Sequence, residues 1–395
     1  MEDKNKMIED ILTRGVEDIF IKEHLEERLR SGDVLRIKLG IDPTSPYIHL
    51  GRAITLRKLK AFQELGHQII LIIGDFTAKI GDPSDKLEKR PSLTDEQIKN
   101  NLERYLEQIA LILDMKKVEV RYNSEWLAGM SIPELARLLE CFTVQQMSKR
   151  RNFKDRLDAG QDVFMDEFLY PALQGYDSVV VKSDVEIGGF DQLFNLKAGR
   201  TVQKRYGQKE QDIITLSMLE GTDGRKMSSS WGNIISIIDA PDEMFGKIMS
   251  LKDDLIVKYF LLTTGLSMEE IDKIDASIKS GENPMTSKKR LAKEIISTYH
   301  SSEEADKAEE DFANKFQKGQ IPTEIETISV AESKNIPDAL VSGKIVSSKT
   351  DFRRLLEAGA ITNLDKDQKM KEIGDFVSGS YRIGAHRFVK LEIKD

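Results

Sequence analysis

The feature of this sequence that most limits its possible folds is a run of five large aliphatic residues inside His67–Gly74. A continuous apolar run of this length, followed by glycine, is typical of a parallel strand that is buried on both faces. The upstream stretch Val34–Ile41 alternates in polarity and also predicts a strand. Between the two, Leu50–Leu65 has helical spacing and ends before a glycine. The sequence therefore predicts a β-α-β unit.

This unit also indicates where a ligand would bind. The connection of a β-α-β unit is right-handed, and ligands of such sheets bind beyond the carboxyl ends of the strands. Two polar segments, Gly40–Gly51 and Gly74–Asp85, leave the predicted strands at this edge. We therefore expect the functional site between these two segments.

The rest of the chain continues the alternation of helices and strands and then becomes helical. Periodicity predicts helices at 7–32, 93–114 with Thr94 as N-cap, 123–151 and 163–176, and strands at 118–122 and 213–219. Residues 240–315 predict a separate helical bundle, 318–327 a linker, and 335–395 a compact mixed segment that ends in the alternating stretch 387–393. This order predicts an α/β domain followed by two smaller domains.

Composition limits the class of protein. A chain of 395 residues is expected to hold two or three domains. No run approaches the ~20 apolar residues that a membrane span needs, and the N-terminus lacks the apolar core of a secretory signal. The only cysteine, Cys141, excludes an intrachain disulfide framework. We therefore expect a cytoplasmic protein with no membrane partner.

The charge of the chain is unevenly distributed. The net charge of −8 argues against nonspecific binding of nucleic acid over the whole surface, but not against an RNA held at one face. From Asn335 onward the chain has 11 Lys and Arg against 9 Asp and Glu, so this tail carries +2 and the preceding residues carry −10. A difference of this size arises by chance about as often as not, so charge alone does not identify the tail.

The first segment with recognisable chemistry is Gly40–Gly51, which reads GIDPTSPYIHLG. It follows a predicted strand and precedes a predicted helix, whose first N–H groups and positive dipole favour a phosphate. Gly51 allows close approach of the backbone, and His49 can donate to phosphate oxygens. Taken alone, such a segment is more often a capped turn with a surface histidine. Its position in the β-α-β unit favours a nucleoside triphosphate.

The second such segment is Lys226-Met-Ser-Ser-Ser230, inside a glycine-punctuated loop from 221 to 233. A lysine ammonium and several hydroxyls could neutralise a pyrophosphate as it leaves. A solvated loop is the commoner reading of such a stretch by itself. An N-terminal nucleotide loop and a distant lysine-serine loop, both beside strands of one sheet, rarely occur together by accident.

With these two segments the chain resembles the class I aminoacyl-tRNA synthetases, whose signatures are written HIGH and KMSKS. They stand here as His49-Leu-Gly-Arg52 and Lys226-Met-Ser-Ser-Ser230. Two further segments, 170–177 and 187–195, look like the tyrosine-specific signatures of tyrosyl-tRNA synthetases. Segments 346–359 and 377–384 look like the small RNA-binding domain of the bacterial enzymes. The resemblance covers essentially the whole chain.

The resemblance implies a Rossmann-like parallel-sheet catalytic domain (1–233), an α-helical domain on the anticodon side (234–320) and a small α+β RNA-binding domain (335–395). It also implies a homodimer formed by the insertion 126–165. The implied reaction joins L-tyrosine to ATP, with Mg²⁺ and no tightly bound cofactor, and transfers the tyrosyl group to tRNA(Tyr).

The resemblance also assigns roles to individual residues. Asp177 would accept the substrate phenol, because a buried carboxylate is left without a partner by phenylalanine. The other residues expected around tyrosine are Lys38, Gly40, Asp82, Tyr170, Gln174 and Gln192. Those expected around ATP are Asp42, Thr44, His49, Gly51, Gly189, Asp191 and Lys226. Those expected in catalysis are His49, Arg52, Lys226, Ser228 and Ser229, and those expected at tRNA are Lys349, Arg353, Arg354, Arg382 and Arg387.

Three positions depart from the family pattern. Arg52 replaces the second histidine of the first signature, and its bulkier guanidinium group either contacts phosphate or points away from it. Ser229 replaces the second lysine of the other signature, so Lys226, Arg225, Mg²⁺ or another cation must meet part of the pyrophosphate charge. Lys38 stands where the best-known bacterial branch has a tyrosine that donates to the phenol, so the second phenol contact is unassigned.

Two alternative functions remain open from the sequence. A catalytically idle RNA-binding paralogue would explain the changes at Arg52 and Ser229, although the other signature residues remain. An enzyme that activates tryptophan belongs to the same class, but Asp177 and the C-terminal segment favour tyrosine.

Overall fold

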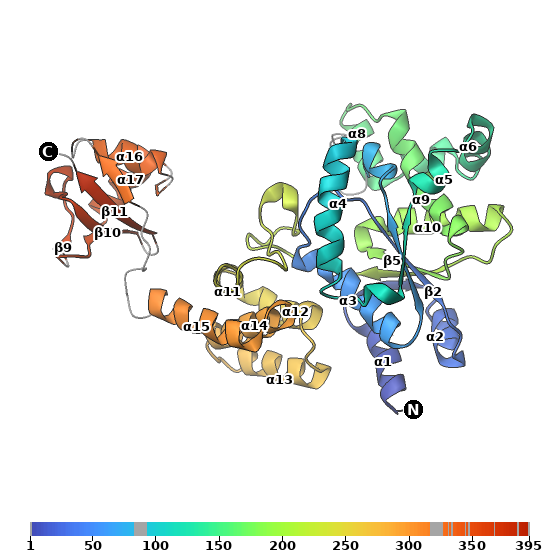
Figure 1. Ribbon diagram of the computed structural model, residues 1–395, viewed down its shortest axis with the longest axis horizontal. Helices are drawn as coiled ribbons and strands as arrows, with labels where there is room; N and C mark the ends of the chain where they lie inside the picture. The colour runs from blue at the N-terminus through green and yellow to red at the C-terminus, as the bar shows by residue number, and fades with distance from the viewer. Residues whose placement is uncertain are drawn as a thin grey trace. The chain divides into compact units, whose positions relative to one another are not determined.

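The computed structural model describes residues 2–82 and 93–316 and, further on, 327–330, 332, 335–343, 345–346, 348–366, 368–384 and 387–393. The chain divides into two compact units, Met1–Ala305 and Asp306–Asp395 (Figure 1). The predicted boundaries between three domains remain predictions. Except for Thr327, the predicted linker 318–327 lies outside the described residues.

The first unit is built on a six-stranded sheet of order β1-β6-β5-β2-β3-β4. The strands are β1 (Val16–Phe20), β2 (Arg36–Ile41), β3 (Gln68–Ile73), β4 (Val118–Tyr122), β5 (Val185–Gly189) and β6 (Asp212–Leu216). The five strands β2 to β6 are parallel, and β1 joins the edge antiparallel to β6. The strand order reverses between β2 and β5, which makes their carboxyl ends the expected ligand crevice.

The predicted β-α-β unit is confirmed as β2, α3 (Leu50–Glu64) and β3, with β2 and β3 paired in parallel. Each of the five aliphatic residues of β3 is at most 1% exposed, as expected for a strand covered on both faces. The predicted strands 118–122 and 213–219 correspond to β4 and β6. The predicted helix 93–114 is α4 (Asp95–Ile109), with a capping box formed by Thr94 and Gln97.

The sequence pattern misled us in two places. Residues 7–32 are not one helical stretch but α1 (Glu2–Thr13), β1 and α2 (Lys22–Ser31), because Gly15 and Gly32 adopt positive φ and end the two helices. The sequence pattern also does not predict β5, which has five residues and ends in two glycines. Strand β1 is placed by its pairing with β6, which is distant in sequence, and β5 by its pairing with β2 and β6 on either side.

Further helices complete this unit. Residues 124–158 form α5 (Ser124–Leu127), α6 (Ile132–Leu139), α7 (Val144–Ser148) and α8 (Arg151–Asp158), and capping boxes at Ser131 and Thr143 divide this stretch into short helices. Helices α9 (Met165–Val180) and α10 (Leu193–Arg205) pack on each other beside β5. The predicted helical bundle is α11 (Pro241–Met249), α12 (Ile256–Thr263), α13 (Met268–Lys279) and α14 (Pro284–Tyr299), which lie together in Figure 1. Helix α15 (Ser302–Phe316) crosses the boundary of the two units.

The second unit contains a five-stranded sheet of order β7-β11-β10-β8-β9. Its elements are β7 (Thr327–Val330), α16 (Ile336–Ser342), α17 (Lys349–Glu357), β8 (Ile361–Asn363), β9 (Gln368–Lys369), β10 (Gly379–Ile383) and β11 (Arg387–Ile393). Phe352, Phe376 and Tyr381 lie in its own apolar core. Among the described residues, no helix is long and apolar enough to cross a membrane.

Candidate active site

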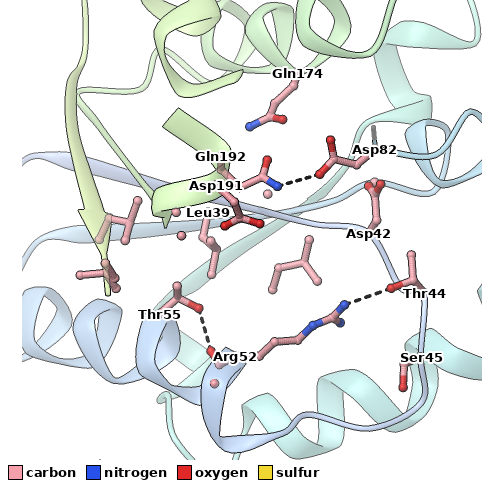
Figure 2. Close-up of a pocket in the computed structure, with 18 of the residues that line it drawn as sticks. Leu39, Asp42, Thr44, Ser45, Arg52, Thr55, Asp82, Gln174, Asp191 and Gln192 are labelled. Carbon is pink, nitrogen blue, oxygen red and sulfur yellow. Dashed lines mark hydrogen bonds between the residues drawn. The ribbon is translucent and has the colours of Figure 1, made fainter. Parts of the chain in front are cut away.

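A cavity of about 440 Å³ opens at the carboxyl ends of β2 and β5, where the strand order reverses (Figure 2). It lies between the segments that follow β2 and β3, as the β-α-β unit predicts. Lys38 does not line it. The residues expected at tyrosine, ATP or the reaction that do line it are Gly40, Asp42, Thr44, His49, Gly51, Arg52, Asp82, Tyr170, Gln174, Asp177, Gly189, Asp191, Gln192, Lys226, Ser228 and Ser229.

His49 is the N-cap of α3, and its Nδ1 accepts a hydrogen bond from the backbone N–H of Arg52 at 3.3 Å. Burial, and then the charges of Arg52 and Lys226, lower the pKa of His49 to about 3. The ring is therefore neutral near pH 7 and carries its proton on Nε2, because Nδ1 is the acceptor. His49 can offer one neutral N–H to a bound anion.

Arg52 is held in place by two hydroxyl groups. Its Nη1 donates to the phenol oxygen of Tyr105 at 2.7 Å. Its Nη2 donates to Thr44 Oγ1 at 3.0 Å, as Figure 2 shows. Tyr105 belongs to α4 and Thr44 to the segment after β2. The guanidinium therefore links the nucleotide segment to α4 while it lines the cavity.

Helix α4 also binds the backbone of the nucleotide segment directly. Asn101 Nδ2 donates to the carbonyl of Pro43 at 2.9 Å, and Gln108 Nε2 donates to that of Pro46 at 2.8 Å. The buried Gln108 Oε1 accepts from the N–H of Ile48 at 2.8 Å. Sequence reasoning missed these amides. Their spacing of seven residues places both amides on one face of the helix, which is visible in the sequence. The segment that they bind lies more than fifty residues away, so the sequence does not indicate it as their partner.

The lysine-serine loop reaches the cavity from the segment after β6. Lys226 Nζ lies 2.8 Å from a carboxylate oxygen of Asp191. Inside the loop, the buried Asn233 accepts from the N–H of Ser228 at 2.9 Å and donates to Asp223 at 2.7 Å. The N–H of Gly51 lies 3.4 Å from the sulfur of Met227. The two signature segments, far apart in sequence, are therefore in contact.

At the other end of the cavity Asp177 is buried on α9. Its carboxylate accepts from the indole nitrogen of Trp126 at 2.9 Å. Burial raises the pKa of Asp177 to about 7, although Lys38 and hydrogen bonds from Trp126 and Asn123 act in the opposite direction. Such a buried carboxylate is suited to accept a hydrogen bond from a hydroxyl group of a buried ligand.

Asp42, in the segment after β2, binds α9 and the segment after β3. Its carboxylate accepts from Tyr170 Oη at 2.8 Å and from Thr77 Oγ1 at 2.9 Å. A Cβ at Gly74 would lie 1.9 Å from this carboxylate, so only glycine fits at the end of β3. Burial, followed by the charge of Asp42, raises the pKa of Tyr170 well above its usual value.

Asp82 is a second carboxylate with several donors around it. Gln192 Nε2 donates to it at 2.7 Å, as Figure 2 shows, and Asn195 Nδ2 donates at 3.3 Å. Arg150 lies 3.9 Å from it. We had not assigned Asn195 or Arg150. Asn195 ends one of the tyrosine signatures and could have been inferred from it, whereas nothing local in the sequence marks Arg150.

Lys38, which we expected at the substrate, is fully buried behind the cavity. Its ammonium lies 2.9 Å from Glu186, donates to Ser178 Oγ at 2.7 Å and donates to the carbonyl of Gln174 at 3.0 Å. These partners match the three donors of an ammonium group.

The residues expected at tRNA belong to the second unit. Lys349, Arg353 and Arg354 lie on α17, Arg382 on β10 and Arg387 on β11. Lys349 pairs with Asp338 at 2.7 Å and Arg354 with Asp351 at 2.8 Å, at the surface. Among the described residues, no three His, Cys, Asp or Glu side chains are grouped so that they could hold a metal ion.

Comparison with known proteins agrees with this geometry. The family described as tRNA synthetases class I (W and Y) matches residues 30–317. The tyrosine–tRNA ligase of Thermotoga maritima is 46% identical over 89% of this chain and 88% of its own length. That of Carboxydothermus hydrogenoformans is 44% identical over 97% of both chains.

Solved structures support the fold. A tyrosyl-tRNA synthetase from Archaeoglobus fulgidus, complexed with L-tyrosine, is 24% identical and covers 78% of this chain and 99% of its own, with a TM-score of 0.62. A C-terminally truncated mitochondrial tyrosyl-tRNA synthetase from Aspergillus nidulans is 20% identical and covers 80% and 99%, with a TM-score of 0.64. Together with the relatives above 40% identity, these matches show that the chain belongs to the tyrosyl-tRNA synthetases, ligases of the class I aminoacyl-tRNA synthetases.

Proposed function

We propose that the cavity binds L-tyrosine and ATP together, joins them as tyrosyl-adenylate and then transfers the tyrosyl group to the 3′ end of tRNA(Tyr). In the first step a tyrosine carboxylate oxygen bonds to the α-phosphorus, and the bond from this phosphorus to the bridging oxygen breaks, so that pyrophosphate leaves. In the second step a ribose hydroxyl of the tRNA attacks the activated carbonyl and AMP leaves. Neither step requires a protein nucleophile, so alignment and charge stabilisation account for catalysis.

The observation that carries this proposal is that chemically different groups line the two ends of the cavity. One end holds the buried Asp177 beside Trp126, which suits a phenol. The other end holds His49, Arg52 and Lys226, which suit a triphosphate. We assign the ammonium of tyrosine to Tyr170, Gln174 and Asp82. Gln192 would also contact tyrosine, Gly189 and Asp191 the ribose, and Asp42, Thr44 and Gly51 the phosphate side.

The charge balance of the cavity suggests how the pyrophosphate is bound. Of the Lys and Arg residues that the structure describes, only Arg52 and Lys226 line the cavity. Lys226 is paired with Asp191, whereas the partners of Arg52 are the neutral hydroxyls of Thr44 and Tyr105. We therefore propose that Arg52 provides the phosphate-binding charge that Ser229 does not supply. Mg²⁺ would enter with ATP as its counter-ion.

The insertion between residues 126 and 165 carries the surface that we propose for a homodimer. Ile132, Val144 and Met165 are 83%, 73% and 79% exposed, and Leu157 and Phe164 are also exposed. Large apolar side chains gathered on one segment favour a protein contact. We expect sedimentation at micromolar concentration to give twice the mass of the chain, and Ile132→Asp together with Val144→Asp to give the mass of one chain.

The first test of the proposed function is exchange of labelled pyrophosphate into ATP without tRNA, in the presence of Mg²⁺. Exchange with tyrosine, but not with phenylalanine or tryptophan, is expected. Exchange that depends on tryptophan would favour the tryptophan enzyme. A folded protein that gives no exchange with any of the three would instead favour an idle RNA-binding paralogue.

The second test separates the tRNA step from activation. We propose that α17 and the strands β10 and β11 bind tRNA through phosphates. Arg353→Gln combined with Arg382→Gln should lower tyrosylation of tRNA(Tyr) severalfold and leave pyrophosphate exchange unchanged. Arg30→Gln, an exposed position on α2, is the matched control and should change neither. Equal losses in both assays would contradict the assignment.

A further inference from the structure

Lys38 and Glu186 form a buried ion pair at the wall of the cavity, which Glu186 lines and Lys38 does not. They are register partners on β2 and β5, the two strands between which the strand order reverses. Their side chains are 0% and 1% exposed and their charged atoms lie 2.9 Å apart. Removing two charges from water costs several kcal/mol per ion, so a buried pair is weak evidence for added stability. Its position beside the substrate cavity suggests another use.

The surroundings of the pair hold it in one arrangement. Ser178 accepts from Lys38 and donates to Glu186 at 3.2 Å, and Gln211 donates to the same carboxylate. A Cβ at Gly199 would lie 2.4 Å from Gln211 Nε2, 2.9 Å from Ser178 Oγ and 3.1 Å from Glu186. Glycine on α10 therefore leaves the room that this network occupies.

Gln174 joins this network to the cavity. Its side-chain Nε2 donates to Glu186 Oε1 at 3.1 Å, and its backbone carbonyl accepts from Lys38. An ionised carboxylate can only accept hydrogen bonds, so Glu186 selects the NH₂ side of the Gln174 amide. The amide oxygen has no hydrogen-bond partner among the described residues, and Gln174 extends from α9 into the cavity (Figure 2).

We infer that the Lys38–Glu186 pair is a positioning device for substrate recognition: it orients the Gln174 amide so that its oxygen accepts from the α-ammonium of tyrosine. Lys38 neutralises Glu186 and binds the backbone of α9, and Glu186 fixes the amide. This inference rests on the proposed function, because it assumes that Gln174 contacts the ammonium of a bound tyrosine. A purely structural role would affect every ligand of the cavity, whereas this role affects only ligands that carry the ammonium.

The test uses Glu186→Gln, which keeps the shape of the side chain. Its amide can both accept and donate hydrogen bonds, so it no longer holds the Gln174 amide in one orientation. We would measure binding of L-tyrosine, of tyramine, which keeps the ammonium, and of 3-(4-hydroxyphenyl)propanoate, which lacks it. Loss of one charge-assisted hydrogen bond is expected to weaken L-tyrosine and tyramine about tenfold. Binding of the propanoate and the KM for ATP should stay within about twofold, since neither depends on this bond.

Two variants control for folding. The double variant Lys38→Met with Glu186→Gln removes both charges at similar volume and should fold with a Tm at or above that of the unmodified chain. It should show the same selective loss even if Glu186→Gln alone unfolds. Glu119→Gln, which removes a half-buried carboxylate of β4 that pairs with Arg36 on β2, should leave all three affinities unchanged.

The outcomes are distinct. Equal weakening of all three ligands, or no weakening of any, in a chain that binds L-tyrosine would overturn the positioning role and leave the proposed function intact. An unmodified chain that binds no L-tyrosine would overturn the proposed function and this inference with it.

Discussion

The indole nitrogen of Trp126 lies 2.9 Å from a carboxylate oxygen of Asp177, deep in the first unit. Trp126 lies in α5, shortly after β4, and Asp177 lies on α9, so the contact joins two segments about fifty residues apart. The indole donates one hydrogen bond to the carboxylate. Asn123 donates a second one, and the Asp177 side chain also lines the cavity.

We expect Asp177→Asn to reduce the preference for tyrosine over phenylalanine. The asparagine oxygen can still accept from Trp126, so the fold should persist, but the negative charge opposite the phenol is lost. Hydrogen bonds to charged groups contribute about 1.5–3 kcal/mol, which corresponds to a loss of about 10- to 150-fold in kcat/KM for tyrosine. Pyrophosphate exchange with each amino acid measures this. Unchanged discrimination would exclude Asp177 as the phenol partner.

The same variant should change how stability depends on pH. The pKa of Asp177 is raised from 3.8 to about 7, so the folded chain binds this proton more tightly than the unfolded chain. Above pH 7 the carboxylate therefore reduces stability, and this cost disappears as the pH falls from about 7 to about 4. Asp177→Asn should raise the Tm at pH 8 and leave it nearly unchanged at pH 4.5. A gain that is equal at both pH values would show that charge is not the cause.

A lysine at position 229 should compensate for the loss of the Arg52 charge. Arg52→Gln removes the cation that we place at the pyrophosphate and should lower exchange about 10- to 100-fold, with little effect on tyrosine affinity. Ser229→Lys in the same chain should restore at least half of that loss on a logarithmic scale, because it returns one positive charge to the same end of the cavity. Arg104→Gln, at an exposed position of α4, should have no effect. If Ser229→Lys does not restore exchange, the proposal that Arg52 provides the phosphate-binding charge missing at Ser229 is contradicted.

His49 should act as a neutral donor over the whole physiological range. With a pKa of about 3, it adds no acidic limb to the rate profile above pH 5. Asparagine is a good N-cap and keeps an N–H donor, so His49→Asn should retain more exchange activity than His49→Ala. Removing one preorganised donor typically lowers kcat about 10²- to 10³-fold, which is the loss expected for alanine.

His49 should also destabilise the folded chain in acid. Its pKa is lower in the folded state, so stability that is present above about pH 6.5 is lost as the pH falls toward 3. At pH 5 this loss amounts to about 2 kcal/mol relative to pH 7.5. His49→Asn should lack it, so its Tm should fall less than that of the unmodified chain between these pH values. Parallel Tm curves would contradict the lowered pKa.

Gln108 should matter for ATP and not for tyrosine. Gln108→Leu leaves the buried N–H of Ile48 without its partner at a cost of about 1–3 kcal/mol and loosens the nucleotide segment. We expect a higher KM for ATP, an unchanged Kd for tyrosine and a lower Tm. Glu107→Leu, at the exposed neighbouring position of α4, is the control. A change in tyrosine binding equal to that in ATP would indicate general unfolding of the site.

Local sequence determined much of this protein. The aliphatic run of β3, the helical spacing of α3 and the capping residues of α4 were sufficient to predict a parallel β-α-β unit and the edge where its ligand binds. The family resemblance named every charged residue that lines the cavity in the described structure except Glu186. These features could be read because each depends on neighbours within about twenty residues, such as strand periodicity and helix caps.

Tertiary structure decided the rest. Strands β1 and β5 have weak patterns of their own: β1 pairs with the distant β6, and β5 lies between β2 and β6. Gln108 acts on a segment more than fifty residues away. The partners of Lys38 were also hidden, because its charge is met by Glu186 across two strands that are neighbours only in the folded sheet. A side chain's charge and shape are written in the sequence, but burial and the partners that compensate it arise only when distant segments pack together.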